Sequence, residues 1–189
     1  MNDSGTEGSA FRMNVTEASI DGVLVISPQV HEDARGWFTE TYSKRKTPQI
    51  KGEFVQDNHV YSARKGTLRG IHFQSPPMEQ AKLIRCVRGA VMDFAIDLRR
   101  GSETYRRWMS VMLSADNKTQ LYIPRGFGHA YVTLTDDTEV LYKTDNYYSP
   151  EHDGAIRWSD PDLGVDWGIE DPILSEKDKN APLLKELRP

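Results

Sequence analysis

The sequence predicts an all-β protein built as an antiparallel sandwich or barrel. Segments rich in β-branched and aromatic residues recur every ten to fifteen residues along most of the chain. Short runs of Gly, Pro, Asn, Asp and Ser separate them, which is typical of turns between antiparallel strands. Strands do not alternate with helical segments, so a Rossmann-type or TIM-barrel architecture is disfavoured.

The expected strands form a regular series. The first, 20–27, ends at Pro28, and turn-forming residues at 33–36 lead into the second. The strands after the first are expected at 37–42, 54–58, 66–74, 82–88, 91–98, 107–114, 120–124, 130–134 and 140–148. Residues 43–50 are polar and are a candidate for a short helix. The arginines at 99–100 and 106–107 lie in turns, where we expect solvated charges.

The chain changes character after Pro150. Residues 156–167 are irregular but aromatic, so we expect them to pack on the domain rather than to form a linker. Ser175, followed by Asp178 three residues later, is typical of a capped helix start, and a leucine-bearing segment continues to Leu187. Pro182 would break or delay this C-terminal helix.

Size and composition indicate one soluble domain. We expect residues 1–189 to form a single unit, with the polar residues 1–12 as a flexible leader. The net charge of −4 gives no electrostatic reason to expect nucleic acid, and no apolar run is long enough for a membrane span. Cys86 is the only cysteine, so no internal disulfide can form, which fits a reducing cytoplasm.

The segment 66–74 carries polar groups where a plain sandwich strand would carry Val, Thr or Ser. In a regular strand, His72 shares one face with Leu68, Gly70 and Gln74, and that face suits the wall of a pocket better than a core. Arg69 would point to the opposite face, unless Gly70 marks a bulge that turns both Arg69 and His72 inward.

A small barrel with several histidines first suggests a metal site. Metal-binding cupin barrels carry a His-x-His pair on one strand and a Pro-x-Gly-x-x-His segment on a later one. The second segment is present as 124–129 and ends at His129, but Gln74 stands where the second histidine of the pair would be. Two histidines and an amide make a weak metal site. The pattern favours a cupin-type barrel whose metal has been replaced by organic acid–base groups.

Organic acid–base groups are present instead. Lys82 lies in an apolar context, where an ammonium can stabilise a developing oxyanion. Tyr142 and Tyr148 are six residues apart and would face the same side of one strand. A tyrosine opposite His72 forms a pair that could take a proton from one face of a substrate and return it on the other.

Several segments, in order and over nearly the whole chain from about residue 20, resemble the dTDP-4-dehydrorhamnose 3,5-epimerase family. They are 56–58, 67–74, 80–86, 97–102, 123–129, 141–143, 147–150, 156–158 and 174–178. The resemblance implies a double-stranded β-helix, or cupin-like jelly roll, that forms a homodimer and needs no cofactor. It also implies inversion at C3 and C5 of a nucleotide-linked 4-keto-6-deoxyhexose on the route to L-rhamnose.

The resemblance assigns roles to particular residues. It implies that His72 is the base and Asp178 its orienting carboxylate, that Lys82 and His129 polarise the C4 oxygen, and that Tyr142 is the acid. Positions that hold the nucleotide or sugar are implied for Arg35, Glu40, Gln56, Asp57, Asn58, Arg69, Tyr148, Asp153 and Lys177.

Departures and alternatives accompany these assignments. Ala130-Tyr131 follows His129 where glycine and another aromatic are common, and Asp153 stands where glutamate is usual. Asp178 could instead serve a helix capping box. The activity could be restricted to C3 or C5, could move the ketone from C4 to C3, or could be lost in a sugar-nucleotide binding module.

Overall fold

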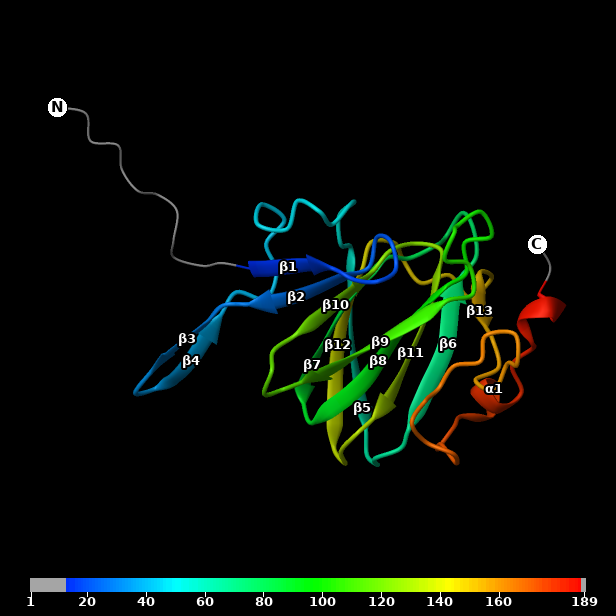
Figure 1. Ribbon diagram of the computed structural model, residues 1–189. Coiled ribbons are helices and arrows are strands. Elements are labelled where there is room, and N and C mark those ends of the chain that lie inside the picture. Colours follow the sequence, from blue (N-terminus) through cyan, green and yellow to red (C-terminus); the bar gives the residue numbers. More distant parts are fainter. Residues whose placement is uncertain (1–12, 188–189) are drawn as a thin grey trace.

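The computed structural model describes residues 13–187, which form two antiparallel sheets packed face to face (Figure 1). The first sheet has the order β1 (Met13–Glu17), β2 (Leu24–Pro28), β10 (Gln120–Ile123), β7 (Lys82–Arg88), β12 (Thr138–Thr144), β5 (Gln56–Ser62). The second has the order β13 (Asp153–Ala155), β6 (Leu68–Gln74), β11 (Phe127–Thr133), β8 (Ala90–Asp97), β9 (Trp108–Ser114). A hairpin of β3 (Val30–Asp33) and β4 (Gly36–Thr39) projects from the body.

The main core lies between the two sheets. Side chains alternate between the two faces of a strand, so every second residue faces this core. In β7, Ile84 and Cys86 therefore face inward while Leu83 faces outward. The buried apolar residues of this interior include Ile84, Cys86, Val91, Leu113, Leu121, Ile123, Phe127 and Val140. Polar side chains replace them in the part of the interior lined by β6, β11 and the start of β7.

Both outer faces are also covered. Residues 156–187 pack on the second sheet, where the Trp167 ring lies with its centroid 4.7 Å from that of Phe94. This confirms the expected packing of the aromatic segment 156–167. The outer face of the first sheet is covered around Ile26, Leu83 and Tyr122 by Ile50 and its neighbours.

The C-terminal helix forms and breaks as predicted. Ser175 Oγ accepts a hydrogen bond from the Asp178 amide and caps α1 (Glu176–Lys179). Helix α1 ends before Pro182, and a short 3₁₀ helix, η1 (Leu184–Glu186), follows it.

The all-β fold class is confirmed, and several local predictions are wrong. Residues 43–50 form turns and not a helix, and β1, β3 and β13 were not expected. Strand β12 ends at Thr144, so Tyr148 does not share a strand with Tyr142. The leader, residues 1–12, lies outside the described residues. No helix in residues 13–187 is long and apolar enough to cross a membrane.

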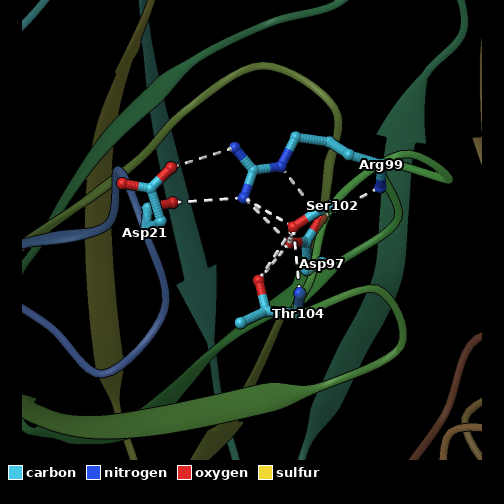
Figure 2. A network of polar contacts seen from close by, with 5 residues as sticks. All are labelled: Asp21, Asp97, Arg99, Ser102 and Thr104. Atoms are coloured by element: carbon cyan, nitrogen blue, oxygen red, sulfur yellow. Dashed lines mark hydrogen bonds and ion pairs between the residues drawn. The ribbon is translucent and has the colours of Figure 1, made fainter.

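Hydrogen bonds to a buried carboxylate hold the loop between β8 and β9 in place (Figure 2). Asp97 is fully buried and accepts hydrogen bonds from Arg99, Ser102 and Thr104. Burial works to raise the pKa of Asp97, but these hydrogen bonds outweigh it and lower the pKa to about 2. Arg99 also contacts the backbone oxygen of Asp21, so the expectation that it is a solvated turn charge is wrong.

Candidate active site

A register shift in the second sheet places two polar side chains of β6 on the same face. His72 lies opposite His129, and Arg69 lies opposite Tyr131, so the stretch between Arg69 and His72 holds one residue more than its partner on β11. Because His129 and Tyr131 are two apart on β11, they share the inward face, and their partners do too. The bulge that the sequence left open at Gly70 is confirmed.

Gly70 is required at this bulge. Its φ is +133°, a region that disfavours residues with a Cβ. A Cβ added at Gly70 would lie 2.4 Å from the Cβ of Ala130 and 2.7 Å from its Cα. The bulge therefore brings the backbone of β6 against β11 too closely for any other residue.

His72 forms a dyad with Asp178. Its Nε2 lies 2.6 Å from Oδ1 of Asp178, which is 3% exposed and comes from α1 on the C-terminal segment. Burial works to raise the pKa of Asp178, but hydrogen bonds from His72, Ser175 and the Gly70 amide outweigh it and lower the pKa. Asp178 is therefore ionised and accepts the Nε2–H of His72, which leaves Nδ1 of His72 as a free base.

His129 has a carboxylate partner that the sequence interpretation missed. Its Nε2 lies 3.0 Å and 3.1 Å from the two carboxyl oxygens of Asp93, which is fully buried on β8. A signal was present, because Asp93 alternates with Val91 and Ala95 on the inward face of an apolar strand. Burial lowers the pKa of His129, the charges of Lys82 and His72 act in the same direction, and Asp93 opposes them.

Lys82 and Tyr142 enter from the first sheet. Lys82 shares the inward face of β7 with Ile84, and Tyr142 of β12 lies opposite Ile84 in the register. Burial lowers the pKa of Lys82 to about 8, although Asp93 and Asp153 act in the opposite direction. Burial raises the pKa of Tyr142, and Arg69 opposes that effect.

A chain of polar contacts joins the edges of the two sheets next to the dyad. Gln56 Oε1 accepts from the Tyr148 amide at 3.1 Å, and the Tyr148 hydroxyl donates to Asp153 at 3.2 Å. Asp153 in turn pairs with Lys177 at 2.5 Å, and Lys177 precedes Asp178 on α1. Asn58 faces inward beside Tyr142, and its buried Nδ2 has no hydrogen-bond partner among the described residues.

Gln74 stands where a metal-binding cupin barrel would carry its second histidine. Its hydrogen bonds instead stabilise this edge of the site. Its Nε2 donates to the carbonyl oxygens of Met78 and Tyr147, and its Oε1 accepts from the Ser149 amide at 2.7 Å. It thereby fixes the segment that carries Tyr148. Within residues 13–187, no three His, Cys, Asp or Glu side chains converge in a way that could hold a metal ion.

Three of the predicted site residues lie elsewhere. Arg35 is at the tip of the β3–β4 hairpin and pairs with Asp33, and Glu40 follows that hairpin and pairs with Lys46. Asp57 faces outward from β5 and pairs with Lys143 at 2.8 Å. The single chain therefore does not bring Arg35, Glu40 or Asp57 to the dyad.

The assembled site has the parts needed for proton transfer at carbon. A carboxylate-paired imidazole lies on one sheet and a phenol on the other, with a buried ammonium near both carboxylates Asp93 and Asp153. Such an arrangement of side chains can remove a proton next to a carbonyl, stabilise the resulting oxyanion and deliver a proton from another direction.

Comparison with known proteins agrees with this chemistry. Residues 17–186 match the family model described as dTDP-4-dehydrorhamnose 3,5-epimerase. The Shigella flexneri protein of that name is 46% identical over 172 residues, covering 89% of this chain and 94% of its own. The Bacillus anthracis enzyme of that name, solved with TDP and PPi bound, superposes with a TM-score of 0.88 at 45% identity, covering 91% of this chain and 99% of its own.

A structure from Legionella pneumophila is also similar to the chain. It is a dTDP-6-deoxy-D-glucose-3,5-epimerase in complex with dTDP-4-keto-L-rhamnose, with a TM-score of 0.89 at 38% identity. The match covers 94% of this chain and 95% of that one. The two-sheet fold is therefore the cupin jelly roll, as the sequence predicted.

Proposed function

Because the chain belongs to the dTDP-4-dehydrorhamnose 3,5-epimerase family, we propose that it inverts C3 and C5 of dTDP-4-dehydro-6-deoxy-D-glucose and forms dTDP-4-dehydro-L-rhamnose. The observation that carries the proposal is the His72–Asp178 dyad on one sheet, with Tyr142 entering the same interior from the other. A base and an acid on different walls suit inversion, since the proton leaves one face and returns to the other.

Each inversion begins with the loss of a proton from carbon. C3 and C5 both adjoin the C4 carbonyl, so removal of either proton gives an enolate with its charge on the C4 oxygen. We assign the removal to Nδ1 of His72, and Asp178 stabilises the imidazolium that forms. Lys82, protonated below its pKa of about 8, donates to the C4 oxygen.

His129 has a conditional part in this polarisation. Its Nε2–H already serves Asp93, and its lowered pKa favours the neutral ring. Neutral His129 therefore has no second N–H to offer, and only its imidazolium form adds to Lys82 at the C4 oxygen.

Tyr142 completes each inversion. It gives its hydroxyl proton to the carbon from the opposite face, the C4 carbonyl re-forms, and Tyr142 is left as a phenolate. The positive charge of Arg69 favours that phenolate, against the effect of burial. Exchange with solvent returns a proton to Tyr142 and removes one from His72 before the next inversion.

The substrate contacts follow the polar edge of the site. We assign the unpaired Nδ2 of Asn58 to a substrate oxygen, since a buried donor without a partner is costly. Gln56, Tyr148, Asp153 and Lys177 form the chain of polar contacts beside the dyad and suit the sugar and the nucleotide. Arg69 supplies a cation in the interior, where a guanidinium suits an oxygen-rich ligand.

A homodimer would account for two of the three site residues that lie elsewhere, Arg35 and Glu40. Trp37 and Phe38 on the hairpin are 58% and 60% exposed, and the hairpin projects from the body. Packing of this hairpin on a second copy would bury the two rings. The same packing would carry Arg35 and Glu40 to the partner's site, where Arg35 would suit the pyrophosphate. We further propose one domain over residues 1–189, no cofactor and a cytoplasmic location, which the single Cys86 supports.

Two variants test the assignment. With dTDP-4-dehydro-6-deoxy-D-glucose as substrate, His72→Ala should form no inverted product by NMR while its circular dichroism stays that of the wild type. Tyr142→Phe removes only the hydroxyl and should slow inversion by about 100-fold or more. A Tyr142→Phe enzyme that gives doubly inverted product at a near-normal rate would show that the acid lies elsewhere. Binding of the substrate without turnover by the wild type would point to a binding module.

A further inference from the structure

A buried phenol in the site takes no part in the chemistry assigned so far. Tyr131 faces inward from the middle of β11 and is 4% exposed. Its hydroxyl lies beside Ser62 but makes no well-formed hydrogen bond with any described residue. Buried hydroxyls of this kind normally find a partner, because leaving one unpaired costs free energy. A donor is therefore available in the interior between the two sheets.

The surroundings of Tyr131 connect it to the proposed acid. In the sheet, Tyr131 lies opposite Arg69 on one side and Asp93 on the other. Tyr142 packs against the interior cluster to which Tyr131 belongs. The two phenols therefore share one compartment, with the Arg69 guanidinium close enough to act on both.

The neighbours of Tyr131 leave its hydroxyl without a well-formed hydrogen bond. Ser62 Oγ already accepts from Nε of Arg69 at 3.2 Å, and a guanidinium has no acceptor to offer. Burial raises the pKa of Tyr131 to about 12, so its hydroxyl keeps its proton when a neighbouring phenol ionises. When Tyr142 gives up its proton, its phenolate becomes a charged acceptor, and a charged acceptor forms a stronger hydrogen bond with this hydroxyl than the neutral Ser62 hydroxyl does.

We propose that Tyr131 is a positioning residue for the acid: its hydroxyl donates a hydrogen bond, directly or through one bound water, to the Tyr142 phenolate left after each protonation of carbon. This inference rests on the proposed function, because it needs Tyr142 to be the acid. Proton removal by His72 does not involve the phenolate. Loss of the Tyr131 hydroxyl should therefore slow the delivery of the proton and leave its removal unchanged.

The test separates these two steps with Tyr131→Phe, which keeps the ring. Wild type and variant are incubated with dTDP-4-dehydro-6-deoxy-D-glucose in D2O, and NMR follows deuterium in the recovered substrate and the formation of inverted product. Label in recovered substrate reports removal and return of a proton by His72 on one face. We expect the variant to invert about tenfold more slowly or worse, since it loses a hydrogen bond to a charged group, while labelled substrate accumulates.

Tyr122→Phe is the matched control. Tyr122 is also 4% exposed, but it belongs to the cluster on the outer face of the first sheet. The Tyr122→Phe variant should introduce deuterium into the recovered substrate and form inverted product at wild-type rates. Equal slowing of labelling and inversion in Tyr131→Phe would overturn the inference, because a structural defect affects both, and so would a variant indistinguishable from the wild type. A wild type that neither labels nor inverts would instead refute the proposed function.

Discussion

At the scale of single residues, the central feature is the sharing of Asp178 between two tasks. Its backbone amide donates to Ser175 Oγ and caps α1, while its carboxylate accepts from His72. The sequence left open whether Asp178 serves the cap or the base. The structure uses different atoms for each task, so the two can be separated by mutation.

Asp178→Asn should therefore keep the fold and lose most of the epimerase activity. The amide oxygen can still accept the Nε2–H of His72, but it carries no charge to stabilise the imidazolium. We expect kcat to fall by about 100-fold or more, with an unchanged circular dichroism spectrum. Ser175→Ala is the control, because it removes the cap and costs about 1 kcal/mol of stability but keeps His72 as the main partner of the Asp178 carboxylate, so it should lower kcat far less than Asp178→Asn does. The reverse pattern would assign Asp178 to the helix alone.

The lowered pKa of Lys82 predicts that the activity depends on pH. Burial lowers its pKa to about 8, and only the protonated form can stabilise an oxyanion. The active form is therefore fully present below that pKa and is lost as the pH rises through it. We expect kcat/KM to decline above about pH 8. Lys82→Arg should lower activity but shift this decline to higher pH, since a guanidinium stays protonated. If kcat/KM of the Lys82→Arg variant declined at the same pH as that of the wild type, the decline would have to come from a group other than Lys82.

At the scale of elements, the site depends on how β6 meets β11. The extra residue beside Gly70 turns Arg69 and His72 to the same face. Gly70→Ala places a Cβ 2.4 Å from that of Ala130 at a φ of +133°. Gly36 has the same φ, but its Cβ would meet nothing within 4 Å, so Gly36→Ala is a control for the backbone strain alone.

We expect Gly70→Ala to lower the free energy of unfolding by about 2 kcal/mol more than Gly36→Ala does, because it adds overpacking to the strain. Urea unfolding measures the difference. Equal losses in the two variants would mean that β6 and β11 can separate at this point without cost.

The elements also mark how far the sequence could predict the structure. Strand β7 has the predicted bounds because the apolar residues of Lys82–Arg88 stand between clear breaks on either side. Strand β12 ends early because the Asp145 carboxylate accepts from the Ala81 amide and the Arg125 side chain, and Asn146 bonds the next residue. The two partners of Asp145 are distant in sequence, so the local pattern could not find this end or place Tyr148 on a loop.

The same reason limits prediction of the site. His72, Lys82 and Tyr142 lie within expected strands, whereas His129 stands just before the expected strand 130–134 because β11 already begins at Phe127. Asp93 was missed because its partner His129 is on another strand, although a charge on an inward face was a signal. The face of β6 on which Arg69 lies depends on a register shift, and a register shift is a property of a strand pair and not of one strand.

At the scale of the whole molecule, the projecting hairpin predicts a dimer with shared sites. Arg35 lies in the turn between β3 and β4, and Figure 1 shows this hairpin projecting from the body of the chain. We expect twice the chain mass by light scattering. Two tagged variants, His72→Ala and Arg35→Ala, should each be impaired, whereas the mixed dimer isolated through both tags should regain activity. Its one intact site would combine His72 of one chain with Arg35 of the other. A monomer, or a mixed dimer as impaired as its parents, would contradict the shared site.

The proposal as a whole depends on proton exchange at two carbons of one substrate. The most direct measurement is incubation of the wild type with dTDP-4-dehydro-6-deoxy-D-glucose in D2O, followed by NMR of the product, with His72→Ala as the control. We predict deuterium at both C3 and C5 of an inverted product, and none at either carbon with His72→Ala. Deuterium at one carbon alone, or movement of the ketone from C4 to C3, would contradict the double inversion.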